Sequence, residues 1–430
     1  FNNRFIVKLL DYNFIVKYYD YNFIVNENFM ATGNITFGEN YFSRPRDENK
    51  IWRKLKQGNH ILLLAPRRVG KSSMIHYLKS NPQPSYTLIY SYVQACQNEQ
   101  AFYEKLLTSI HESDFIQQNT PFAKRFKERF AKLPLNLSVE VAGVKLETKE
   151  SSDKAVIGQA TIRQILMDSL KESDTKVVLA VDEFPDVLIN IYENAGEATA
   201  KAFLASIREL CQDIDFSAKV QFIFTGSIGL DTLAKKLNFS NLINMLENVG
   251  ISELSHDETM AFIDFYLERQ GVATLLDSTS KNALIQAIGW NMPYYLALAC
   301  NQLIEDYGLD VENGLMLTDV HVDKVVESVN RLLKQENTSR FSHWKERLNR
   351  LEILEKKLAN QILKAVSERE LSLSYADAFN LSQQVEFRES VNFAYVMNCL
   401  ASEGYLFQLE DKSYRFTSPL LKHWWQRYGY

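Results

Sequence analysis

Residues 60–73 read HILLLAPRRVGKSS, an apolar run that leads into a short turn containing glycine, lysine and serine. The apolar residues 61–64 are typical of a buried parallel strand. A helix-like stretch through Leu78 follows the turn. This order of strand, loop and helix points backbone amides and the positive end of a helix dipole at one spot. The stretch therefore predicts a phosphate-binding loop.

The residue types of this loop suit a triphosphate and a metal. Lys71 is a mobile point charge that can reach the β and γ phosphates, and the Ser72 hydroxyl can coordinate Mg²⁺, which prefers oxygen ligands. Ala65 stands where such loops usually have glycine, which is tolerable if its φ is negative. The alternative is a helix that begins with Gly-Lys-Ser and binds nothing. We expect the nucleotide to contact Ala65, Pro66, Arg67, Arg68, Val69, Gly70, Lys71, Ser72 and Ser73.

A second apolar run, residues 177–181, ends in Asp182 and Glu183. Carboxylates at this end of a parallel strand lie in the crevice where open sheets bind ligands. Asp182 is expected to hold Mg²⁺, mostly through water, and Glu183 to orient or deprotonate an attacking water. Alone, the pair could be a solvated strand end. Together with the loop it predicts a catalytic site, with both acids at the tip of the adjacent strand.

Two further runs, residues 87–90 and 220–225, alternate with helix-like segments. This alternation predicts an α/β fold with a parallel sheet covered by helices on both faces. In the last run Thr225 and Ser227 could sense a γ-phosphate, or Gly226 could supply a positive φ for a turn. An insertion at residues 113–160 contains a basic helical stretch at 124–132 and a predicted hairpin at 137–146, whose role is unknown.

Strands become scarce after residue 250. Ser255 and Glu258 form a capping box, so a helix should begin there. The region 251–335 predicts several helices, with turns near Gly271, Gly289 and Gly308. Pro293 follows Gly289 and could begin a helix beside an adenine ring, although a plain turn between helices explains the same pattern.

The C-terminal region predicts three helices and a hairpin of strands at 404–409 and 413–417, which is the order of a winged helix. The polar stretch 331–347 predicts a linker or an exposed helix. Trp424 and Trp425 favour core packing over base stacking. The expected domains are residues 30–250 (a P-loop core), 251–335 (a helical lid) and 345–430 (a winged helix).

Residues 1–29 contain three copies of Phe-Ile-Val at a spacing of nine residues. Three such copies are too few for a solenoid. We interpret the segment as a non-native or disordered extension, with Met30 as the natural start; a short β arm is the alternative.

Composition narrows the function further. The 430 residues carry a formal charge of −5, so any nucleic-acid contact must come from a local patch. Four separated cysteines predict reduced thiols, and the absence of a long apolar stretch predicts a cytoplasmic protein without membrane contact. No lysine or arginine occurs between Arg388 and Lys412, so DNA recognition by the predicted third helix of the winged helix is weakly supported.

These motifs together resemble the archaeal-type branch of the AAA+/STAND ATPases, which are related to the origin-recognition ATPases. The resemblance is carried by residues 66–72, 182–184, 225–227, 289–293 and 351–430. It implies a P-loop core, a helical lid and a winged helix, with ATP and Mg²⁺ as ligands and slow hydrolysis unless a partner or a second copy completes the site. It also implies that Phe42 and Arg44 flank the base, although Ser43 replaces the usual glycine of that box.

Two questions stay open at this stage. Arg208 could act as an arginine finger toward a neighbouring subunit, or form surface salt bridges. The function could be that of an ATP-driven conformational switch, of a DNA-associated initiator or transposition-type ATPase that uses residues 124–132, or of a nucleotide-dependent interaction module without hydrolysis.

Overall fold

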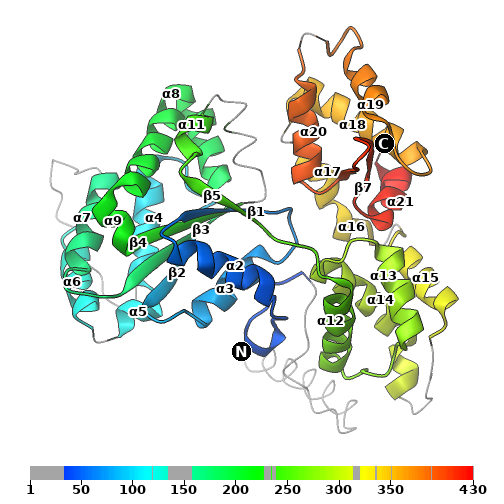
Figure 1. Ribbon diagram of the computed structural model, residues 1–430, viewed down its shortest axis with the longest axis horizontal. Helices are drawn as coiled ribbons and strands as arrows, with labels where there is room; N and C mark the ends of the chain where they lie inside the picture. Colours follow the sequence, from blue (N-terminus) through cyan, green and yellow to red (C-terminus); the bar gives the residue numbers. More distant parts are fainter. Residues whose placement is uncertain are drawn as a thin grey trace, which may run out of the picture.

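The computed structural model describes residues 33–118, 120–133, 157–226, 234, 239–312, 320–334, 337–349, 351–388 and 390–429. The repeats of residues 1–29, the predicted hairpin at 137–146 and Ser227 lie outside the described residues. Figure 1 shows a sheet covered by helices on one side of the view and a mainly helical region, which carries the C-terminus, on the other.

A five-stranded parallel sheet forms the core of the first part, in the order β2-β3-β4-β1-β5. Its strands are β1 (His60–Leu64), β2 (Tyr86–Tyr92), β3 (Lys176–Asp182), β4 (Val220–Gly226) and β5 (Leu246–Gly250). Sequence analysis missed β5, because this edge strand has only two apolar residues, Leu246 and Val249. β4 lies between β1 and β3. The expectation that the loop and the acids follow adjacent strands is therefore wrong.

Helices cover both faces of the sheet, as predicted. One face packs against α2 and α3 through Ile51, Leu55 and Met74, and the other packs against a larger group of helices that includes α4 and α8. The elements of this part that flank the sheet are η1 (Gly38–Asn40), α2 (Pro45–Lys56), α3 (Lys71–Ser80), α4 (Glu99–His111), α5 (Asp114–Gln117), α6 (Pro121–Phe130), α7 (Gln159–Ser169), α8 (Phe184–Gln212), α9 (Ile214–Lys219) and α11 (Ser240–Ile243).

A helical region follows the sheet and begins at the predicted capping box. The Ser255 hydroxyl accepts from the amide of Glu258, whose carboxylate accepts from the amide of Ser255. The helices are α12 (His256–Arg269), α13 (Ser278–Ile288), α14 (Pro293–Glu312), α15 (Val322–Arg331), α16 (Thr338–Phe341) and α17 (His343–Leu348). Gly308 lies inside α14, so the predicted turn there is wrong. The stretch 331–347 is not an exposed linker either, because Phe341 and Trp344 are buried.

The C-terminal elements follow the predicted order of three helices and a hairpin. They are α18 (Ile353–Glu368), α19 (Tyr375–Ser382), α20 (Phe393–Ser402), β6 (Leu406–Gln408), β7 (Tyr414–Phe416) and α21 (Pro419–Tyr428). Trp424 and Trp425 are buried, which confirms core packing for this pair. A single apolar cluster extends from α12 to α21, so the helices after the sheet and the C-terminal elements pack on each other. None of the helices in the described ranges has the length and apolar character needed to span a bilayer.

Gly226 ends β4 directly against the start of α8. A Cβ at this position would lie 2.4 Å from Cδ of Pro185. Gly226 has no positive φ, so this close approach, and not the turn considered above, explains the glycine. Because the proline ring cannot move independently of its backbone, we expect Gly226→Ala to lower the free energy of unfolding by about 1–3 kcal/mol in a denaturant titration. Gly250→Ala is the matched control, since its Cβ would meet only the Leu64 carbonyl oxygen, at 3.8 Å. Equal stability of the two variants would contradict this explanation.

Candidate functional site

The predicted phosphate loop lies between β1 and α3. Gly70 has φ +94°, a left-handed conformation that favours glycine, and α3 begins at the next residue, Lys71. Ala65 has no positive φ, so alanine is tolerated there. The Lys71 amine is buried and donates to the carbonyl oxygens of Ala65 at 2.7 Å and Pro66 at 2.8 Å. Burial lowers the pKa of Lys71 to about 8, against the opposing effect of two acids, Glu183 and Asp182.

Asp182, at the end of β3, accepts hydrogen bonds from three side chains and from the amide of Glu183. Its Oδ2 accepts from the Ser72 hydroxyl at 2.9 Å and from the Tyr90 hydroxyl at 2.8 Å, and its Oδ1 accepts from the Thr225 hydroxyl. The Ser72–Asp182 contact joins the loop after β1 to the end of β3, across the strand β4 that lies between them. β4 itself contributes Thr225. The loop serine and the acid therefore meet although their strands are not neighbours.

Glu183 follows Asp182 in the left-handed region, with φ 60° and ψ 38°. Few non-glycine residues adopt this conformation, and those that do cluster at functional sites. Burial raises the pKa of Glu183, as do Asp186 and Asp182 nearby, whereas Lys71 and Arg67 lower it. A carboxylate with a raised pKa is a better proton acceptor near neutral pH than an ordinary glutamate.

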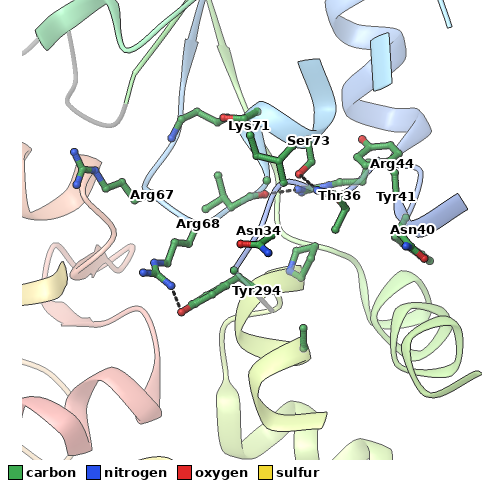
Figure 2. Close-up of a pocket in the computed structure, with 18 of the residues that line it drawn as sticks. Asn34, Thr36, Asn40, Tyr41, Arg44, Arg67, Arg68, Lys71, Ser73 and Tyr294 are labelled. Carbon is green, nitrogen blue, oxygen red and sulfur yellow. Dashed lines mark hydrogen bonds between the residues drawn. The ribbon is translucent and has the colours of Figure 1, made fainter. Parts of the chain in front are cut away.

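A cavity of about 260 Å³ lies beside the loop, and Figure 2 shows side chains from the loop, the N-terminal segment and α14 around it. Many predicted site residues line this cavity: Phe42, Arg44, Arg67, Arg68, Val69, Gly70, Lys71, Ser72, Ser73, Glu183 and Pro293. Four predicted residues belong to the same loop and strand ends but do not line it: Ala65, Pro66, Asp182 and Thr225. Ser227 lies outside the described residues, so its sensor role stays a prediction.

Sequence reasoning missed several residues of this cavity. The remaining lining residues are Gly33, Asn34, Ile35, Thr36, Asn40, Tyr41, Phe262, Tyr266, Tyr294 and Ala297. Tyr294 adjoins Pro293 and could have been found from that motif. The segment 33–36 carries no recognisable pattern, and it reaches the loop through a hydrogen bond of 3.1 Å from the Thr36 amide to the Ser73 hydroxyl.

Arg44 contacts the loop and the chain that leads to α12. Its Nη1 donates to the carbonyl oxygen of Val69 at 3.0 Å, and its Nη2 donates to that of Ser252 and lies 3.2 Å from the Asp47 carboxylate. The guanidinium is therefore already engaged by protein groups. Phe42 packs edge-on against Phe262 of α12, with ring centroids 5.3 Å apart. Contacts of Arg44 and Phe42 with a base remain predictions.

A second contact joins the loop directly to α14. Arg68 donates a hydrogen bond to the Tyr294 hydroxyl, and its guanidinium lies over the Tyr294 ring, 4.5 Å from the centroid. Figure 2 shows this pair at the lower edge of the loop. Tyr294 is the second residue of α14, directly after Pro293. The position of this helix is thus coupled to the conformation of the loop.

Other predicted contacts are less direct. Arg208 does not line the cavity of its own chain; it bonds Gln212 and the carbonyl oxygen of Asn241, and no ion pair to it is found among the described residues. In the basic stretch, Arg125 binds the Ser169 carbonyl oxygen and Arg129 pairs with Asp168. Of the basic residues of that stretch, only the lysines are exposed, and Glu128 between them is exposed too. Action of Arg208 on a neighbouring subunit stays a prediction.

The donor set fits a magnesium ion held partly by a nucleotide. No group of three or more His, Cys, Asp or Glu that could hold a metal occurs in the described parts of the chain. Mg²⁺ commonly uses one or two protein oxygens, with phosphate and water completing its octahedron. Ser72 and Asp182, whose oxygens lie 2.9 Å apart, provide such a pair.

Comparison with known proteins supports the same architecture. No protein-family model matches the sequence, and no curated protein matches it. The chain is similar to the Walker-type ATPase PABY2304 of Pyrococcus abyssi, with TM-score 0.56 and 16% identity over 90% of this chain and 97% of that one. It is also similar to two Aeropyrum pernix proteins. For ORC2, solved as ADPNP–ADP complexes, the TM-score is 0.49 at 12% identity, with 91% and 96% of the two chains covered. For ORC1, solved with DNA, the values are 0.36, 11%, 91% and 94%.

Of these three similarities, the first alone exceeds a TM-score of 0.5, and at 16% identity it establishes a shared fold. The fold is that of a Walker-type P-loop ATPase, with a parallel sheet followed by helical regions over nearly the whole chain. This confirms the fold class predicted from the motifs.

Proposed function

We propose that the protein binds ATP with Mg²⁺ and hydrolyses it slowly, and that the nucleotide state changes the arrangement of the loop and the lid. One observation carries this proposal: Ser72 contacts Asp182 at 2.9 Å, while Lys71, Ser72 and Glu183 line one cavity. If Asp182 were only an acid at a solvated strand end, there would be no reason for it to accept a hydrogen bond from the hydroxyl of Ser72 in the phosphate loop.

Each group has a chemical role in this proposal. Ser72 and Asp182 hold the metal, which neutralises phosphate charge and orients the triphosphate when bound. The Lys71 amine leaves the carbonyl oxygens of Ala65 and Pro66 and donates to the phosphates. Glu183 orients a water and accepts its proton at the carboxylate, which its raised pKa favours.

The switch is supported by contacts that link the loop to the lid. Arg68 binds Tyr294 at the start of α14, and Arg44 binds both Val69 in the loop and Ser252 before α12. Any change that an anion causes in the loop must either alter these contacts or move α14 and the segment before α12 together with the loop. Segments that respond to a γ-phosphate in this way are a common basis of nucleotide-driven switching.

Titration of the parent protein with ATP, by calorimetry with and without Mg²⁺, tests the proposal. We expect binding that is stronger with Mg²⁺, together with slow phosphate release. Binding without phosphate release would favour the interaction module. Absence of binding would contradict all of these functions. The DNA-associated role, the protein partner, self-association and the cytoplasmic location stay predictions.

A further inference from the structure

Arg67, inside the phosphate loop, differs from the other basic side chains around the cavity. The basic residues that line the cavity are Arg44, Arg67, Arg68 and Lys71. Backbone carbonyl oxygens accept hydrogen bonds from Arg44 and Lys71. The Tyr294 hydroxyl accepts one from Arg68. Arg67 has no hydrogen bond or ion pair with any of the described residues. A ligand can therefore engage its guanidinium without displacing a contact to the protein.

The position of Arg67 directs its side chain to the same side of the loop as the lysine. Arg67 lies four residues before Lys71 in the sequence and is partly exposed. Figure 2 shows both side chains extending to one side of the loop, whereas Arg68 reaches toward Tyr294. Glu183 lines the same cavity. Arg67 thus shares an accessible space with the two groups that, in the proposed function, bind the phosphates and accept a proton.

The charge of Arg67 also acts on the acidic side of the site. Burial and two nearby acids raise the pKa of Glu183, whereas Lys71 and Arg67 lower it. Burial and the same group of acids raise the pKa of the Tyr92 hydroxyl, at the end of β2, and Arg67 again opposes the rise. The guanidinium therefore lies within electrostatic range of the strand ends that carry the acids, and not only of the loop.

We propose that Arg67 is a catalytic residue that stabilises the negative charge developing during ATP hydrolysis. In this step the oxygen of a water attacks the terminal phosphorus, and a proton of the water passes to the Glu183 carboxylate. The bond from that phosphorus to the bridging oxygen breaks, and its electron pair stays on the diphosphate. A guanidinium that donates hydrogen bonds to oxygens gaining charge lowers the barrier of this step.

The inference rests on the proposed function and adds the source of the catalytic cation. The phosphate loop itself supplies it, so hydrolysis does not need an arginine from a neighbouring subunit. Arginine suits this task because its guanidinium stays charged and presents several donors to phosphate oxygens.

Single-turnover phosphate release and equilibrium binding together test this role. Loss of one donor to a developing charge should slow hydrolysis by Arg67→Gln about 100-fold or more. The affinities for ADP and for a non-hydrolysable ATP analogue should change by less than about threefold, because the contact strengthens mainly in the transition state. Retained binding also shows that the variant is folded. Arg67→Lys keeps the charge and should recover part of the rate, and it serves as the test if Arg67→Gln does not fold.

Arg53→Gln is the matched control for this variant. Arg53 is an exposed arginine of α2 that does not line the cavity. Its replacement removes the same charge from the chain and should leave both the rate and the affinities as in the parent.

A mixture of two variants decides whether Arg67 acts within its own chain. Arg67→Gln and Glu183→Gln each lack one group, and no single chain in the mixture has both. The mixture should therefore hydrolyse ATP no faster than the two variants measured separately. Recovery of hydrolysis on mixing would show that the arginine of one chain serves the site of another, which would overturn the inference.

The outcomes also separate this inference from the function on which it rests. If the parent binds no ATP, or binds it without releasing phosphate, the proposed function is wrong and this role falls with it. If the parent hydrolyses ATP and Arg67→Gln does so at the same rate, only the role of Arg67 is overturned. A rate loss matched by equal losses of ADP and analogue affinity would overturn it as well, because Arg67 would then act in binding alone.

Discussion

Lys71→Ala should lose ATP affinity by roughly 100-fold, because a charge-assisted contact of about 3 kcal/mol disappears. The loss has a structural basis, since the amine lies buried at the centre of the loop, within reach of two carbonyl oxygens that a phosphate can replace. Equilibrium titration with a fluorescent ATP analogue measures it. An affinity equal to that of the parent would defeat the nucleotide-site interpretation.

The pH dependence of binding adds an independent check on the same residue. The pKa of Lys71 is lowered to about 8 without nucleotide, so the amine is protonated below that pH and progressively neutral above it. ATP affinity of the parent should therefore fall as the pH rises beyond about 8. Lys71→Ala should lack this fall. Lys79→Ala is the matched control: this lysine lies on the same helix, is partly exposed and should affect neither affinity nor its pH dependence.

Glu183→Gln should keep ATP binding and lose hydrolysis by about 10²–10⁴-fold, the usual contribution of a general base. The amide keeps the size of the side chain and removes only its ability to take a proton. Single-turnover phosphate release, measured beside ATP binding, separates the two effects. Unaltered turnover would remove Glu183 from this role. Glu193→Gln, at an exposed position of α8, is the control and should behave as the parent.

The acidic limb of the parent's pH profile should also depend on Glu183. A base acts only when deprotonated, and burial together with Asp186 and Asp182 raises the pKa of this carboxyl. Hydrolysis should therefore fall at a higher pH than an ordinary glutamate would produce, as the pH is lowered through the raised pKa. The residual activity of Glu183→Gln should lack this limb.

The predicted elements that succeeded are local ones. Two of them are apolar runs, one before the loop and one before Asp182, and the third is the capping box at Ser255. Each is a pattern of neighbouring residues that only one local structure satisfies. Strand β5 was not predicted, because its two apolar residues do not form an apolar run. The predicted turn at Gly308 was wrong, because the tertiary packing of α14 outweighs the low helix propensity of glycine.

The candidate site divides in the same way. Lys71, Ser72, Asp182 and Glu183 could be found because parallel strands present their carboxyl ends at one edge, so the motif positions alone predict that the side chains converge. Tyr294 could be found only in part, from its neighbour Pro293. The segment 33–36 could not be found at all, since it carries no recognisable pattern.

Sequence alone determined the phosphate loop, the acids and the α/β order of the chain, because these depend on residues close together along it. Tertiary structure alone decided that β4 lies between the loop strand and the acid strand, that Arg44 is engaged by the loop and by Ser252, and that Arg347 is buried against Glu403. The physical reason is that strand order and burial of a charge follow from packing between distant segments. A local pattern contains no information about such partners.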